Sequence, residues 1–239
     1  MFRHTRLPGE SAEYLAAREE LRLAEIELMH RREEVAARRR ALPPGPPLDD
    51  YVFLEGPADL DSGDEPVREV RLSELFTAPE TTPEARLEST PERPLIMYQF
   101  MYGKAQTDPC PMCTLWIDGF SNIAHHVTRN ADFVIAAAAD PPVLRTYARS
   151  RGWHRLRLLS CGDSTFKYDT GSEDKDGGQD STVSVFTRDG DGTVRHFYSA
   201  HPRMSPDIAE RGIDVLAPVW HLLDLTPQGR GDWYPSVDY

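Results

Sequence analysis

Two cysteines separated by two residues, Cys110 and Cys113, are the part of the sequence best suited to chemistry. They follow a nearly continuous apolar run, residues 95–102, and open a segment with apolar residues at three- and four-residue spacing. That pattern predicts a buried strand followed by an amphipathic helix. Unpaired N–H groups and the helix dipole at a helix N-terminus lower a thiol pKa from about 8.5 to roughly 3.5–7.5. The position therefore predicts a reactive thiol.

The two thiols are predicted to have different roles. Cys110 should lie at the cap or in the first turn of the helix with its sulfur exposed, whereas Cys113 belongs to the buried face. We expect Cys110 to attack a disulfide and Cys113 to resolve the mixed disulfide. Pro111 suits the first helical position, where its missing N–H costs nothing.

Residues near the pair are candidates for support. Thr107, Asp108, Pro111 and Trp116 are the predicted capping and supporting residues. The carboxylate of Asp108 would raise the pKa of the Cys110 thiol unless it turns to solvent or caps the helix. Asp118, one to two turns beyond Cys113, is the candidate base for the proton of the resolving thiol, with a solvent-exposed position as the alternative.

Other interpretations of the cysteines stay open. Cys110, Cys113 and His126 begin a zinc-finger spacing, but Asn130 stands where a further ligand would fall, so no metal is expected. Thr107 matches part of the peroxiredoxin pattern P-x-x-x-T-x-x-C, in which the proline is replaced here by Gly103. The cysteines could also be inert structural residues. Cys161 is expected to be a small buried residue.

Composition excludes several classes of function. The net charge of -12 gives no electrostatic support for binding nucleic acid. No apolar run reaches the roughly 18 residues of a membrane span, and the N-terminal residues lack the apolar core of a secretory signal. Three cysteines do not make the framework of a small disulfide-rich domain. We therefore expect a cytoplasmic protein that needs no cofactor beyond its cysteines.

Residues 10–42 are predicted to form an N-terminal helical arm, because they are rich in Ala, Glu, Leu and Arg and contain no Gly or Pro. Apolar residues recur every seven positions, at Tyr14, Leu21, Leu28, Val35 and Leu42. The positions three residues later are small or charged, which is incomplete for a coiled-coil seam. A homodimer through this helix is one expectation, and packing on a globular domain is the other.

Residues 43–239 are predicted to form one α/β domain with a Pro-rich acidic insertion at about 77–94. Strands are expected at 51–54, 95–102, 133–137, 156–159, 183–187 and 194–198, with a further strand leading into a helical turn at 67–76. Helices are expected after Pro109, from Pro141 and at about 213–223. The alternation of strand and helix from residue 95 to 159 predicts a layer sandwich, and the last two strands predict a hairpin.

The sequence resembles a bacterial family of predicted dithiol-disulfide oxidoreductases, related to the alkyl hydroperoxide reductase and thiol-specific antioxidant group. The resemblance is carried by RRRALP (38–43), YVF (51–53), LSELF (72–76), MYQFMYG (97–103), CPMC (110–113), WIDGF (116–120) and LDLTPQGR (223–230). It implies a thioredoxin-like fold whose redox cysteines are Cys110 and Cys113. One departure is that residues 179–182 contain no proline, whereas thioredoxins carry a cis-proline before the strand that faces the disulfide.

The pattern and the resemblance together predict a thiol-disulfide oxidoreductase that exchanges the CPMC dithiol with protein or low-molecular-weight disulfides. The alternatives are a thiol-dependent peroxidase of peroxiredoxin type and a redox-inert thioredoxin-like module that binds partners through the long helix. Neither nucleic acid nor a membrane is expected as a partner.

Overall fold

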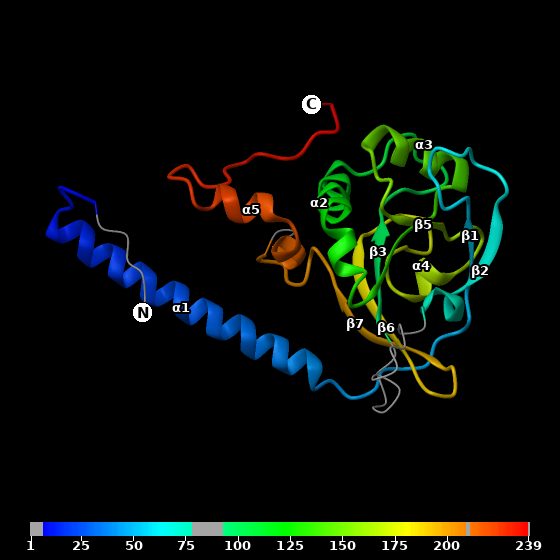
Figure 1. Ribbon diagram of the computed structural model, residues 1–239, viewed down its shortest axis with the longest axis horizontal. Helices are drawn as coiled ribbons and strands as arrows, with labels where there is room; N and C mark the ends of the chain where they lie inside the picture. The colour runs from blue at the N-terminus through cyan, green and yellow to red at the C-terminus, as the bar shows by residue number, and fades with distance from the viewer. Residues whose placement is uncertain (1–6, 78–92, 209–210, 239) are drawn as a thin grey trace. The chain divides into compact units, whose positions relative to one another are not determined.

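The computed structural model describes residues 7–77, 93–208 and 211–238, which form a mixed α/β protein with one seven-stranded sheet (Figure 1). The elements in chain order are α1 (Ala12–Arg40), β1 (Val52–Glu55), β2 (Arg68–Arg71), η1 (Leu72–Leu75), β3 (Leu95–Phe100), α2 (Pro111–Val127), β4 (Asp132–Ala137), α3 (Pro141–Arg151), β5 (Arg157–Ser160), α4 (Phe166–Asp169), β6 (Thr182–Arg188), β7 (Val194–Ala200), η3 (Arg211–Leu216) and α5 (Pro218–Leu223).

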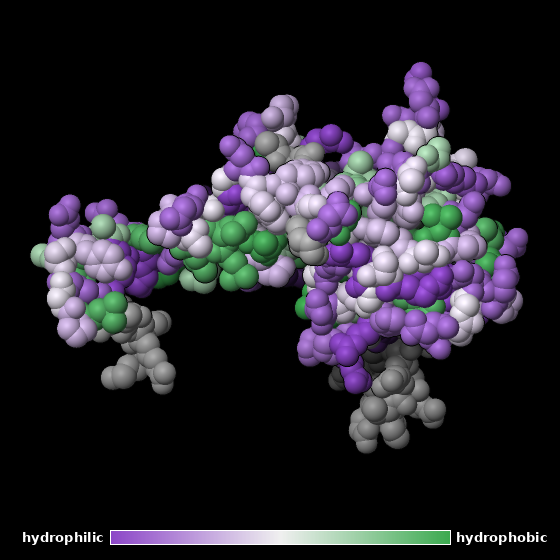
Figure 2. Space-filling model, turned by 90° about the horizontal axis from the view of Figure 1, so that it is seen from above, coloured by the Kyte–Doolittle hydropathy of each residue, from purple (hydrophilic) through white to green (hydrophobic). Residues whose placement is uncertain are grey.

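The chain divides into two units, Met1–Pro43 and Pro44–Tyr239. The first contains α1, which starts where the Ser11 side chain accepts a hydrogen bond from the N–H of Tyr14 (3.1 Å). No residue of α1 is buried, and Leu21 and Leu28 are 59% and 60% exposed. Figure 2 shows green apolar patches on a surface that is otherwise mostly hydrophilic. Within the described ranges, no helix combines the length and apolar character needed to cross a membrane.

The sheet of the second unit has the strand order β2-β1-β5-β4-β3-β6-β7. The three central strands β5, β4 and β3 run parallel, and the outer neighbours pair antiparallel. Along β3, Leu95 lies opposite Asp132 of β4 and Phe100 lies opposite Ala137. The predicted alternation of strands and helices and the C-terminal hairpin are confirmed, as is the long N-terminal helix.

Both faces of the sheet carry an apolar core, because successive residues of a strand point to opposite faces. On β3, Tyr98 and Phe100 join the core that includes α2 and α3, whereas Leu95 and Met97 join the core that includes η1 and Phe166 of α4. The helix that carries the cysteine pair therefore covers one face of the parallel strands and starts near the end of β3.

Two predictions about elements need correction or restriction, and one short helix was not predicted. The single helix expected at about 213–223 is two, because Pro218 lacks an N–H and favours an extended Ala217 (φ −119°, ψ 113°). The four-residue helix α4 was not predicted, since it is too short to show a helical period. Most of the predicted acidic insertion at about 77–94, residues 78–92, lies outside the described residues.

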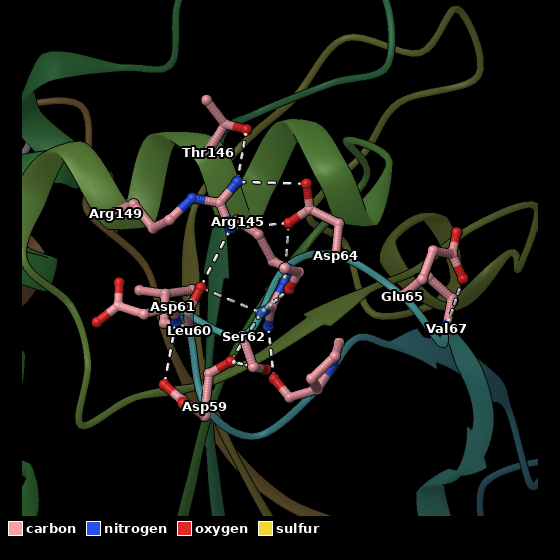
Figure 3. Close-up of polar contacts among 12 residues, drawn as sticks. Asp59, Leu60, Asp61, Ser62, Asp64, Glu65, Val67, Arg145, Thr146 and Arg149 are labelled. Atoms are coloured by element: carbon pink, nitrogen blue, oxygen red, sulfur yellow. Dashed lines mark hydrogen bonds and ion pairs between the residues drawn. The ribbon is translucent and has the colours of Figure 1, made fainter.

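The loop between β1 and β2 is held against α3 by two arginines (Figure 3). Arg145 is 4% exposed and donates to the Asp64 carboxylate (3.2 Å). Its guanidinium also donates to the carbonyl oxygens of Pro57, Asp59, Leu60 and Gly63, at 2.6–3.3 Å. The hydrogen bond from Arg149 is the main reason that the pKa of Asp64 is lowered. A buried guanidinium thus satisfies the carbonyl groups of an irregular loop.

Candidate active site

Cys110 is the N-cap residue of α2, with an extended backbone (φ −60°, ψ 123°) immediately before Pro111. Its sulfur accepts a hydrogen bond from the N–H of Cys113 (3.5 Å), and its carbonyl oxygen accepts from the N–H of Thr114 (3.0 Å). Its own N–H donates to the carbonyl of Met101, just after β3 (3.2 Å). The sulfur of a partly exposed residue is therefore fixed against an N–H of the first helical turn, the environment that favours a thiolate.

Cys113 differs from Cys110 because it is 0% exposed and belongs to the core between α2 and the sheet. Burial, and then the hydrogen bond and charge of Cys110, raise the pKa of Cys113 well above its usual value. Tyr98 and the backbone of Met101 act in the opposite direction, through hydrogen bonds that lower this pKa. Cys113 is thus a protonated thiol that can donate to the sulfur of Cys110.

Tyr98 of β3 brings a phenol to the pair. Burial raises its pKa well above 10.0, and both cysteines add to the rise, while a hydrogen bond with Ser181 opposes it. Its buried Oη interacts with the Cys113 thiol and lowers the pKa of that group. Ser181 stands just before β6, in the segment that lacks the proline of thioredoxins.

Lys167 of α4 is 1% exposed, and its Nζ donates to the carbonyl oxygen of Phe100, the last residue of β3 (3.2 Å). Burial lowers the pKa of Lys167, and the charges of Cys161, Cys113, Glu173 and Asp180 act to raise it. A buried amine therefore lies close enough to the cysteine site to interact with it electrostatically. Cys161 itself is 2% exposed, and burial raises its pKa to about 12.

Asp118 makes contacts that tie α2 to the end of α3. Its carboxylate accepts from Nε1 of Trp153 (2.8 Å), a residue that is 1% exposed, and pairs with the Arg151 guanidinium. These contacts fit a structural role, and the predicted role as a base stays a prediction.

The remaining predicted supporting residues differ in burial. Trp116 is 1% exposed and packs edge-on against Tyr98, with ring centroids 6.2 Å apart. Thr107 and Asp108 are exposed in the loop before Cys110. The carbonyl oxygen of Thr107 accepts from the Tyr102 hydroxyl (3.5 Å), and the Asp108 charge adds to the burial that raises the pKa of Tyr102.

The structure thus gathers Cys110, Pro111, Cys113 and Trp116 at one helix start. It adds Tyr98, Ser181 and Lys167, which the sequence analysis missed. Tyr98 lies inside the run 95–102, where it looks like any other core residue, and Lys167 is flanked by two aromatic residues that offered only a weak hint of burial. Within the described ranges, no group of three or more His, Cys, Asp or Glu residues is arranged to hold a metal ion.

A family model described as "Bacterial protein of unknown function (DUF899)" matches residues 4–239. The chain belongs to this family. No curated protein matches this DUF899 chain. Among solved structures, it is similar to AhpC of Mycobacterium bovis, with 16% identity over 76% of this chain and 97% of that chain (TM-score 0.45). It is also similar to the peroxidoxin BcpB of Mycobacterium tuberculosis, with 16% identity over 73% and 94% of the two chains (TM-score 0.45).

Proposed function

We propose that this DUF899 protein has a thioredoxin-like fold and catalyses thiol-disulfide exchange through Cys110 and Cys113. The observation that carries the proposal is the asymmetry of the pair. Cys110 is partly exposed at the N-cap of α2, with its sulfur facing the N–H of Cys113, while Cys113 is buried with a raised pKa. An accessible nucleophile beside a shielded second thiol is the arrangement that exchange through a mixed disulfide requires.

The reaction has two steps. The Cys110 thiolate attacks one sulfur of a substrate disulfide, forms a mixed disulfide and releases the other substrate sulfur as a thiolate. Cys113 then loses its proton and attacks Cys110 Sγ, which forms the Cys110–Cys113 disulfide and releases the second substrate thiolate. Two electrons pass from the dithiol to the substrate, and both released thiolates take up protons according to their pKa values.

Protein or low-molecular-weight disulfides are the substrates this arrangement would take, and the two cysteines supply all the redox chemistry. Pro111 lets α2 start directly after Cys110 without losing a hydrogen bond. Trp116 closes the apolar side of the site against Tyr98.

The test mixes the reduced protein with dithiobis(nitrobenzoate), which releases coloured thionitrobenzoate first when Cys110 is modified and again when Cys113 resolves it. We expect two equivalents from the wild type, one stable mixed disulfide from Cys113→Ser, and no fast release from Cys110→Ser. Cys161→Ser is the matched control and should behave as wild type, because Cys161 is buried with a pKa of about 12. Cys110 and Cys113 that both stay open to alkylation after oxidation would overturn the proposal.

Two competing functions are separated by related measurements. A peroxidase would consume hydrogen peroxide much faster than it consumes a disulfide, with a sulfenic acid at Cys110 that condenses with Cys113 and loses water. The function of a redox-inert binding module would be unchanged in Cys110→Ser. The exposed apolar side chains of α1, such as Leu21 and Leu28, are the observation that favours binding of a partner through the long helix.

A further inference from the structure

One peptide group links Lys167 to the resolving cysteine. Nζ of Lys167 donates to the carbonyl oxygen of Phe100 (3.2 Å), which also accepts from the N–H of Tyr102 (2.9 Å). The next backbone group is that of Met101, which lowers the pKa of Cys113 by hydrogen bonding. Only a donor stabilises a thiolate, so we assign this effect to the Met101 N–H. Phe100 C=O and Met101 N–H are the two ends of the same planar amide.

We propose that Lys167 is a positioning residue for the second step of exchange, acting on the Cys113 thiolate through the Phe100–Met101 peptide and through its charge. This inference rests on the proposed function, because it concerns the moment at which Cys113 ionises.

The physical reason is the burial of Cys113. A thiolate at a site that is 0% exposed is penalised by desolvation, and the second step cannot proceed until that thiolate forms. A cation at the carbonyl end of an amide polarises it and strengthens the N–H at the other end as a donor. The same positive charge also stabilises a nearby anion directly. Both effects act on a thiol whose ionisation is unfavourable.

The other ionisable groups around the two partners are few. Cys161, Cys113, Glu173 and Asp180 act on Lys167, and all four favour its charged form. The side chains that most affect the pKa of Cys113 are Cys110, whose charge opposes ionisation, and Tyr98, which assists it. Lys167 interacts with the charge of Cys113 as well, and Tyr98 assists as a neutral donor.

The experiment follows the two phases of thionitrobenzoate release by stopped flow as a function of pH, in the full chain. Lys167→Met keeps the length and apolar stem of the side chain but removes the charge and the donor. The first phase, which reports Cys110, should be unchanged. The second should slow by about tenfold at neutral pH, and its apparent pKa should rise by at least about one unit.

Two further variants make the result specific. Lys167→Gln removes the charge and keeps an amide donor. An apparent pKa of the second phase between those of wild type and Lys167→Met would therefore support the link through the peptide. This variant also replaces Lys167→Met if that variant does not fold. Lys104→Met is the matched control, because Lys104 is exposed and pairs with Asp163. It should leave both phases unchanged.

The outcomes separate this inference from the proposed function. A second phase with the same pH profile in Lys167→Met, Lys167→Gln and wild type would overturn the role of Lys167 and leave the exchange reaction intact. A wild-type protein without any second phase would overturn both.

Discussion

Asp118 is the residue for which the sequence and the structure suggest different roles, and the substitution Asp118→Asn distinguishes them. The sequence suggests a base for the proton of Cys113, whereas the structure shows an acceptor for Trp153 and a partner for Arg151. Asparagine has nearly the same shape and still offers an oxygen to the Trp153 indole, but it has no charge and cannot act as a base. We expect it to lower stability modestly and to leave both steps of exchange unchanged.

The magnitude follows from the exposure of the ion pair. The Arg151 and Asp118 side chains are 21% and 33% exposed, between a surface pair worth about 0–1 kcal/mol and a buried one whose disruption costs about 3–5 kcal/mol. Asp118→Asn should therefore cost about 1–2 kcal/mol, or roughly 2–8 °C in Tm for a chain of this size. Asp118→Ala should cost about 1–3 kcal/mol more, because it leaves the buried Nε1 of Trp153 without its acceptor.

Urea unfolding gives the stability, and the second phase of thionitrobenzoate release gives the rate at which Cys113 reacts. Loss of a general base lowers the rate of the step it serves by about 10²–10⁴. A fall of that size in Asp118→Asn, with an unchanged free energy of unfolding, would refute the structural role and show that Asp118 acts as the base for Cys113.

Three other predictions follow from the same contacts. Arg145→Met should lower the free energy of unfolding by about 3–5 kcal/mol in urea titrations, because four loop carbonyls and Asp64 lose a buried donor; a loss below about 1 kcal/mol would contradict this. Glu55 is 7% exposed, and burial acts to raise its pKa, but the hydrogen bonds and charges of Arg157 and Arg68 together lower it. Its folded pKa is below its unfolded one, so the stability it contributes is present above the unfolded value of about 4.3 and is lost as pH falls through the folded value. Thermal melts at falling pH should therefore show a shallower loss in Glu55→Gln than in wild type, and parallel curves would contradict the assignment. If the exposed apolar positions of α1 pair with a second copy, the full chain should sediment as a dimer and the double variant Leu21→Glu, Leu28→Glu as a monomer with unchanged melting temperature; equal masses would exclude that pairing.

The sequence predicts the framework of the second unit because its elements have strong local signals. The run beginning at Leu95 has no polar residue before Gln99, which predicts a buried strand. The spacing of Cys113, Trp116, Ile117 and Phe120 matches the helical period, which predicts the buried face of the helix. Pro111 and Pro141 each mark a helix start. The placement of Cys110 at a helix N-terminus required nothing beyond these local rules.

The contacts that complete the site depend on long-range packing, which has no local signal. Lys167 meets Phe100 across 67 residues, and Trp153 meets Asp118 across 35. A lysine is ordinarily exposed, so the two aromatic neighbours of Lys167 do not suffice to predict a side chain at 1% exposure. The contacts of Asp118 have no local signal either, since Arg151 lies at the end of another helix and Trp153 just beyond it.

The burial of Lys167 lowers the free energy of unfolding, which gives a second test of its proposed positioning role. Burial lowers its pKa from 10.5, so between its folded pKa and about 10.4 the unfolded chain binds more protons than the folded one. Stability contributed by this residue therefore falls as pH is lowered through that window, and at neutral pH Lys167 disfavours folding. Lys167→Met removes this penalty, while the N–H of Tyr102 still satisfies the Phe100 carbonyl. The variant should equal or exceed wild type in its free energy of unfolding, by up to about 3 kcal/mol at neutral pH, and the difference should shrink as pH rises. A residue whose removal stabilises the fold while slowing the Cys113 step is held there by function, whereas a large loss of stability in Lys167→Met would show that its role is structural.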